Sequence, residues 1–146
     1  MTSFTRTSLP AGVERLLRDI VDDGFTIYCC GDRAAPTALA ASYEWEHCVD
    51  LVTIRRFDRV IAARAPKPVD VFAPQVVVWA YQGTAECTLA ALLHLVHPQH
   101  PHAPGIEYPA PGSLRIPPHE QRPMTIRPPS PGRARIRATR LATAQR

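Results

Sequence analysis

The fold class is decided by residues 25–65, which read FTIYCCGDRAAPTALAASYEWEHCVDLVTIRRFDRVIAARA. Four stretches in this region are rich in β-branched and aromatic residues or alternate apolar with polar residues, and each is predicted as a strand: 25–30, 37–46, 48–55 and 60–65. The stretch 37–46 has a rival interpretation, a helix opened by Pro36 and favoured by its alanines. The strand is favoured because the alternation continues to Glu46.

Helices are predicted on both sides of these strands. Residues 10–22 carry an apolar stripe at helical spacing, and Gly24 is expected to end this helix. The stripe consists of Val13, Leu16, Leu17, Ile20 and Val21. Residues 75–81 form a continuous apolar run, which predicts a fifth strand buried on both faces. Thr84 is a candidate N-cap for a second, largely apolar helix that extends to about residue 96.

The predicted order is therefore one helix, five strands and a second helix. This order is typical of an α+β domain in which a small antiparallel meander of about five strands carries two helices on one face. The other face of the sheet is expected to be open to solvent. It would display Glu44 and Glu46, with Asp50 and Arg55 as further candidates.

The chain has 146 residues, a length that suits one domain with a modest core. We predict a flexible N-terminus over 1–9, the α+β domain over 10–97, and a Pro-rich, Arg-rich, largely irregular tail over 98–146. Of the 16 prolines, 11 lie between Pro98 and Pro131. The apolar runs are too short to span a membrane, and the first residues lack the apolar segment of a signal peptide. A cytoplasmic protein without membrane contact is expected.

Net positive charge is confined to the C-terminal part of the chain. Residues 1–112 carry 9 basic and 12 acidic groups, whereas residues 113–146 carry 8 arginines and one acid, Glu120. The tail is therefore predicted to bind a partner through Arg133, Arg135, Arg137, Arg140, Pro128 and Pro131. One competing interpretation is a solvated tail whose arginines reflect a GC-rich genome. Another is that the tail drapes over the domain through Ile106, Tyr108, Leu114, Ile116 and Ile126.

Cysteine and histidine residues form no strong metal or redox motif. The four cysteines, Cys29, Cys30, Cys48 and Cys87, include no C-x-x-C pair and are interpreted as buried thiols in a reducing compartment. His94 and His97 are three apart on a predicted helix and are the candidate metal ligands, with Cys87, His100 and His102 near them in sequence. We favour helix capping for this pair, and we predict no metal and no cofactor.

An acidic patch is the candidate catalytic site. Glu44 and Glu46 share one face of a predicted strand, and His47 and Asp50 follow, so these groups could act on a glycosidic bond or hold a hard cation. Solvated surface carboxylates are the commoner explanation. The sequence from His47 to Arg55 lacks the tight loop of a cysteine phosphatase, and residues 31–33 lack a nucleotide-binding motif.

These observations favour a non-enzymatic intracellular interaction or adaptor module whose Pro-rich and Arg-rich tail contacts a protein partner. The first alternative is non-specific nucleic-acid association, in which the C-terminal arginine cluster binds phosphates. The second alternative is a small enzyme that uses Glu44, Glu46, His47 and Asp50. A homodimer through outward apolar residues of the strands also stays open.

Overall fold

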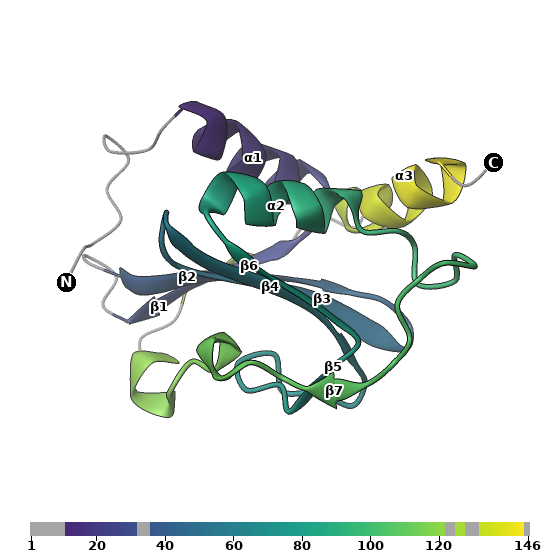
Figure 1. Cartoon of the computed structure of the whole chain (residues 1–146). Coiled ribbons are helices and arrows are strands. Elements are labelled where there is room, and N and C mark those ends of the chain that lie inside the picture. Colours follow the sequence, from purple (N-terminus) through teal and green to yellow (C-terminus); the bar gives the residue numbers. More distant parts are fainter. Residues whose placement is uncertain (1–10, 32–35, 122–124, 128–131, 145–146) are drawn as a thin grey trace.

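A six-stranded antiparallel sheet forms the centre of the molecule (Figure 1). The computed structural model describes residues 11–31, 36–121, 125–127 and 132–144. The strands of the sheet are β1 (Thr26–Gly31), β2 (Pro36–Glu44), β3 (Cys48–Arg56), β4 (Arg59–Pro66), β6 (Trp79–Gly83) and β8 (Thr125–Arg127). Their order is β6-β4-β3-β2-β1-β8, so five strands are neighbours in the order in which the chain reaches them. The predicted α+β meander is confirmed, and β8 adds a strand that the sequence did not predict.

Two predicted helices, α1 (Ala11–Asp22) and α2 (Ala85–His94), cover one face of the sheet, where α3 (Ile136–Ala144) joins them (Figure 1). Alternation along the strands supplies the core under these helices, because every second residue points to the same side. The buried residues of this core include Val13 and Ile20 of α1, Leu89 and Leu92 of α2, Tyr43 of β2, and Val52 and Ile54 of β3. The predicted placement of α1 and α2 on one face is therefore confirmed.

Local signals fix the ends of these helices. The Thr84 hydroxyl accepts a hydrogen bond of 3.3 Å from the Cys87 amide at the start of α2, as its type predicts. After α1, Gly24 has a φ of +103°, which disfavours any residue with a Cβ. A Cβ at Gly24 would also collide with the carbonyl oxygen of Arg133. This glycine therefore allows both the turn and the close approach of the C-terminal segment.

The face opposite the helices was predicted to be open, and this prediction is wrong. β5 (Val76–Val77), β7 (Tyr108–Pro109) and the 3₁₀ turns η2 (Gly112–Leu114) and η3 (Pro118–Gln121) lie across it (Figure 1). A second core packs beneath them, and its buried members are Val49, Leu51, Ile61, Ala63, Ala65, Val77 and Leu114. Strands β3 and β4 are apolar on both faces, so each face needs a cover.

Much of this cover comes from residues after 97. Leu114 and Ile116 are both 1% exposed on this face, whereas Leu141 of α3 is buried in the core under the helices. β8 pairs with β1, with Ile27 opposite Arg127. Of the other residues expected to drape over the domain, Ile106 and Tyr108 are exposed, and the Ile126 side chain lies outside the described part. Packing thus continues beyond residue 97.

No helix among the described residues is long and apolar enough to cross a bilayer.

Candidate functional site

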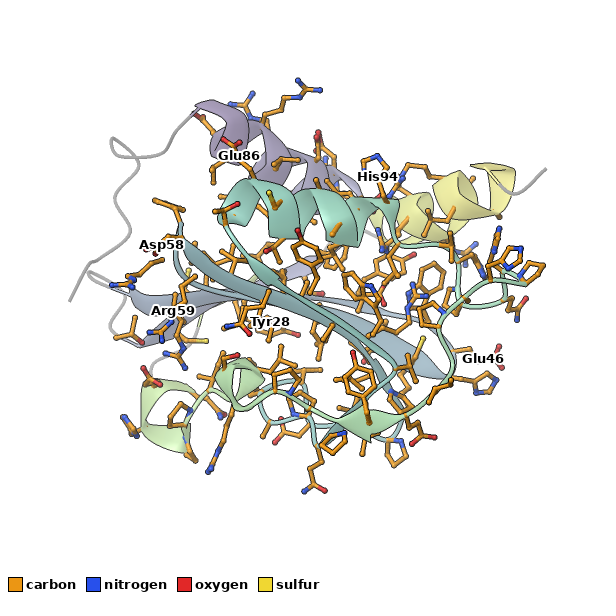
Figure 2. The ribbon with its side chains drawn as sticks, in the orientation of Figure 1. Tyr28, Glu46, Asp58, Arg59, Glu86 and His94 are labelled. Atoms are coloured by element: carbon orange, nitrogen blue, oxygen red, sulfur yellow. The ribbon has the colours of Figure 1, made fainter. Side chains whose placement is uncertain are left out.

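The residues predicted as a catalytic patch are only partly brought together: Glu46 Oε1 lies 3.7 Å from His47 Nε2, but Asp50 lies apart from them. Glu44, Glu46 and His47 are exposed near the end of β2, and Figure 2 shows Glu46 at the end of the sheet away from Arg59. Asp50 is fully buried on the helix side, opposite Tyr43 in the neighbouring strand. It lies on the other face because β3 turns its even-numbered residues toward the helices. The four residues therefore cannot act on one substrate.

The histidines have separate structural surroundings. His94 Nδ1 lies 2.8 Å from the carbonyl oxygen of Ala90 on the same helix. The His97 ring packs edge-on against Trp45, with 4.7 Å between the ring centres. Burial and the nearby Arg64 charge lower the pKa of His97. Among the described residues, no group of three or more His, Cys, Asp or Glu side chains is arranged to hold a metal ion.

The predicted partner-binding arginines are distributed between the interior and the surface. Arg137 is fully buried, and Arg140 binds Asp23 with Nε–Oδ1 at 2.8 Å. Arg133 pairs with Asp22 at 3.4 Å, whereas Arg135 is exposed and makes no ion pair within the described residues. Pro128 and Pro131 lie outside the described residues. Arg137 cannot contact a partner while the protein is folded, because its guanidinium is enclosed.

A charge cluster, defined as the buried residues Asp23, Asp50, Arg64 and Arg137 together with the exposed Arg140, connects α3 to the sheet. Arg64 Nε donates to Asp50 Oδ1 at 2.6 Å. Arg137 Nη2 donates to Asp50 Oδ2 at 3.0 Å, and Arg137 Nη1 donates to Asp23 Oδ2 at 2.7 Å. Such charge-assisted bonds are among the stronger hydrogen bonds in proteins. The cluster therefore fixes the position of α3 on the fold.

Aromatic residues complete the surroundings of this cluster. Trp45 Nε1 donates to Asp50 Oδ2 at 2.9 Å, and the Tyr43 hydroxyl donates to the Ala134 carbonyl at 2.8 Å. The Arg137 guanidinium lies 5.1 Å from the centre of the Phe25 ring, within range of a cation–π interaction. No buried side-chain N or O atom of the described residues lacks a hydrogen-bond partner. The buried polar atoms of the cluster therefore all have hydrogen-bond partners within the protein, and none of them is left for a ligand.

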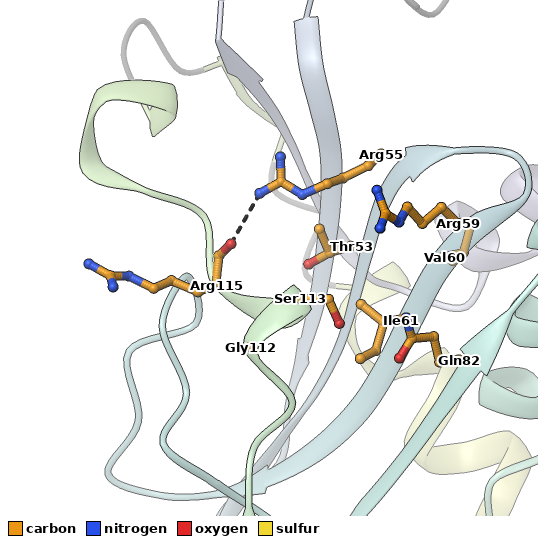
Figure 3. Close-up of a pocket in the computed structure, with 9 residues that line it drawn as sticks. All are labelled: Thr53, Arg55, Arg59, Val60, Ile61, Gln82, Gly112, Ser113 and Arg115. Atoms are coloured by element: carbon orange, nitrogen blue, oxygen red, sulfur yellow. Dashed lines mark hydrogen bonds between the residues drawn. The ribbon is translucent and has the colours of Figure 1, made fainter. Parts of the chain in front are cut away.

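A separate pocket of about 260 Å³ lies on the opposite side of the sheet, between the strands and η2 (Figure 3). We call it the basic pocket. Its lining residues are Thr53 and Arg55 of β3, Arg59, Val60 and Ile61 of β4, Gln82 of β6, and Gly112, Ser113 and Arg115 at η2. Three of the nine are arginines, and among these described lining residues there is no Asp, Glu, His or Cys. The pocket is therefore a site of positive potential.

Arg55 is held in place at one side of the basic pocket. Its Nη1 donates to Glu120 Oε1 at 3.1 Å, and its Nη2 donates to the Arg115 carbonyl at 3.1 Å. The ion pair is partly buried, so it is less screened by water than a surface pair. Figure 3 shows the Arg115 side chain directed away from the other lining residues, so Arg115 contributes to the pocket lining mainly through its backbone atoms.

Several donors of the basic pocket have no acceptor among the residues that the structure describes. Thr53 is only 4% exposed, yet its hydroxyl makes no hydrogen bond with any described residue. Because no buried polar atom of the described residues is left fully enclosed without a partner, this hydroxyl opens into the pocket. The side chains of Arg59, Gln82 and Ser113 also make no hydrogen bond within the described part of the chain. A buried hydroxyl without a partner is costly unless water or a ligand satisfies it.

Sequence reasoning did not find this pocket. Thr53 has the residue type of an ordinary strand position, and Arg55 and Arg59 flank a turn in which charged residues are common. Ser113 belongs to the segment predicted as an irregular tail. The available signal was weak, namely two arginines at one end of a hairpin in a region that is otherwise net acidic.

Comparison of the chain with protein-family models, with curated proteins and with solved structures gave no match.

Proposed function

We propose that this protein is an interaction module that binds an anionic group of a partner in the basic pocket. The observation that carries the proposal is the Thr53 hydroxyl, which is almost fully buried, has no hydrogen-bond partner in the described protein and opens between Arg55 and Arg59. Convergent donors with positive charge are the features that recognise an anion.

The composition of the pocket supports binding more than catalysis. General acid–base or nucleophilic catalysis needs a side chain that can carry a proton or an electron pair at the reacting atom. The described lining supplies arginines, hydroxyls and an amide, and the carboxylate of Glu120 is already paired with Arg55. Within the described part of the chain, neither Thr53 nor Ser113 has a basic partner that could activate its hydroxyl. These groups suit stable recognition of a ligand.

The class of function proposed here is the one predicted from the sequence, an interaction module. The recognition site is the basic pocket and not the Pro-rich, Arg-rich tail. The tail was expected to present Arg137 and Arg140, but both side chains are bonded to Asp23. Breaking these bonds to free the arginines would leave the buried carboxylate of Asp23 without its arginine partners, which costs several kcal/mol. The basic pocket needs no such rearrangement. For the same reason, the arginine cluster is a poor basis for nucleic-acid binding.

Thermal unfolding with simple anions tests this proposal. The full-length protein is titrated with sulfate, phosphate and malonate at constant ionic strength, and a ligand that binds only the folded state raises the Tm. We expect at least one anion to raise the Tm of the wild type. Arg59→Ala should abolish the shift. Arg56→Ala is the matched control because it removes the same charge from a neighbouring exposed arginine outside the pocket lining.

Two results would contradict the proposal. One is the absence of a shift with every anion. The other is an equal shift in wild type, Arg59→Ala and Arg56→Ala, which would indicate a general effect of the salt on the protein.

A further inference from the structure

We infer that the anionic group held by the basic pocket is a phosphate monoester, an inference that rests on the proposed function. The pocket differs from a simple carboxylate site in the arrangement of its donors and in its size.

Donors reach the basic pocket from several directions. Thr53 comes from β3, Arg59 from β4, and Ser113 from η2 on the far wall (Figure 3). Gln82 adds an amide from β6, which is an edge strand of the sheet. A carboxylate offers two oxygens in one plane and is matched well by a single arginine fork. A phosphate monoester offers three strong acceptor oxygens around one atom, which suits donors spread over three walls.

The local charge favours an anion. Of the three lining arginines, Arg115 directs its side chain away from the other lining residues, which leaves the charges of Arg55 and Arg59. Glu120 offsets the charge of Arg55 through their ion pair, so the formal excess is one positive charge, from two arginines and one carboxylate. A phosphate monoester carries a charge of about −1.5 to −2 at neutral pH, and a single carboxylate carries −1. Charge attracts both anions, and the preference for phosphate follows from the number and directions of the donors.

The volume allows more than a bare ion. At about 260 Å³, the pocket approaches the lower end of the range of roughly 300–1,000 Å³ that is usual for small-molecule sites. Val60 and Ile61 give it an apolar wall, which suits the carbon atoms attached to the ester oxygen. This space fits a phosphoryl group with a short organic substituent. A phosphorylated side chain of a protein and a small free phosphate ester share this chemistry.

Isothermal titration of the full-length protein at constant ionic strength tests the inference. The probes are a short peptide containing phosphoserine, the same peptide with Glu in its place, glycerol phosphate, and malonate as a carboxylate dianion. We expect at least one ester to bind about tenfold or more tightly than both carboxylate probes. Tighter binding of the phosphopeptide would indicate that the natural ligand is a phosphorylated protein. Tighter binding of glycerol phosphate would indicate that it is a free metabolite.

Variants show whether the pocket is responsible. Thr53→Val keeps the shape of the side chain and removes the hydroxyl, and it should weaken ester binding by about tenfold or more, because hydrogen bonds to charged groups contribute about 1.5–3 kcal/mol. Ser113→Ala, in the less buried wall, should weaken ester binding and provides a test if Thr53→Val does not fold. Arg56→Ala should bind the ester like the wild type.

The outcomes separate this inference from the proposed function. If the carboxylate probes bind as tightly as the esters and Arg59→Ala weakens both, the phosphate inference is wrong and the anion-binding module remains. If no probe binds, both are wrong. Ester binding that is unchanged in Thr53→Val and in Ser113→Ala would also overturn the inference, since the hydroxyls would then play no part.

Discussion

Arg137 of α3 and Asp50 of β3 are 87 positions apart in the sequence, and Arg137 Nη2 donates a hydrogen bond of 3.0 Å to Asp50 Oδ2 in the interior. Both side chains are fully buried. Arg64 approaches the same carboxylate from β4. This relationship joins the C-terminal helix to the middle of the sheet, and it makes a segment that reads as a solvated tail part of the folded structure.

Loss of Arg137 should strongly destabilise the protein. Removal of one partner from a buried ion pair typically costs about 3–5 kcal/mol, because the other charge is left without compensation. We therefore expect Arg137→Met to lower the free energy of unfolding, measured by urea denaturation, by about 3 kcal/mol or more. Arg135→Met is the matched control on the exposed turn before α3 and should change stability by less than about 0.5 kcal/mol. Equal stability of the two variants would contradict the structural role.

Acid should remove the contribution of Asp23. Burial raises the pKa of this carboxyl, but hydrogen bonds and charges from Arg140 and Arg137 outweigh burial, and the pKa lies below its usual range. A carboxyl with a lowered pKa in the folded state stabilises the protein fully above its unfolded pKa of about 3.9, and this stabilisation is lost as the pH falls through the folded pKa.

The pH dependence can be assigned to Asp23 with a variant. Asp23→Asn should be less stable than the wild type near pH 7, and the difference should shrink as the pH falls below about 4. Urea denaturation across this range measures it. Asp22→Asn, at the exposed neighbouring position, should keep the pH dependence of the wild type. A gap between Asp23→Asn and wild type that stays constant in acid would contradict the assignment.

The cover on the second face of the sheet should contribute as much as an ordinary core. Leu114 is 1% exposed and packs against the strands, so Leu114→Ala should cost about 2–5 kcal/mol. Ile106 belongs to the same connecting segment but is 85% exposed, and Ile106→Ala should have little effect. Thermal and urea denaturation of both variants would measure this. A small cost at Leu114 would mean that the cover is not held tightly in solution.

Thiol labelling should follow the burial of the cysteines. Burial raises the pKa of Cys30 and of Cys48 to about 11, so at pH 8 almost no thiolate is present at either position. Cys87 is exposed on α2. In the native protein we expect a thiol reagent to modify Cys87 and to leave Cys30 and Cys48 unmodified until denaturant is added. Mass spectrometry of the digested protein identifies the labelled sites, and rapid native labelling of Cys48 would contradict this core packing.

Local patterns were enough to predict the meander. The alternation from Leu39 to Glu46 predicts β2 against the competing helix, and the structure places Tyr43 and Trp45 in the core under the helices. The apolar stripe of α1 and the Thr84 cap of α2 were also readable, since each depends on residues within one or two helical turns. These features depend on neighbours in sequence, so a single sequence contains them.

The burial of Arg137 was not readable in the same way. An arginine in a Pro-rich and Arg-rich segment is usually exposed to solvent. The burial of Arg137 depends on Asp23 and Asp50, which are 114 and 87 positions away in the sequence. The basic pocket has the same origin, because Ser113 meets Thr53 only after residues 104–121 have crossed the sheet. Such long-range pairings leave no local periodicity in the sequence.

The placement of α3 has a consequence for synthesis of the chain. A ribosome makes Asp23, Asp50 and Arg64 well before it adds Arg137 and Arg140, so in the nascent meander Asp50 already has Arg64 as a counter-charge, whereas Asp23 still lacks its two arginine partners. Domains usually fold as complete units during translation. Here the core under the helices is complete only when Leu141 has been added, and until then its apolar neighbours in that core lack part of their cover.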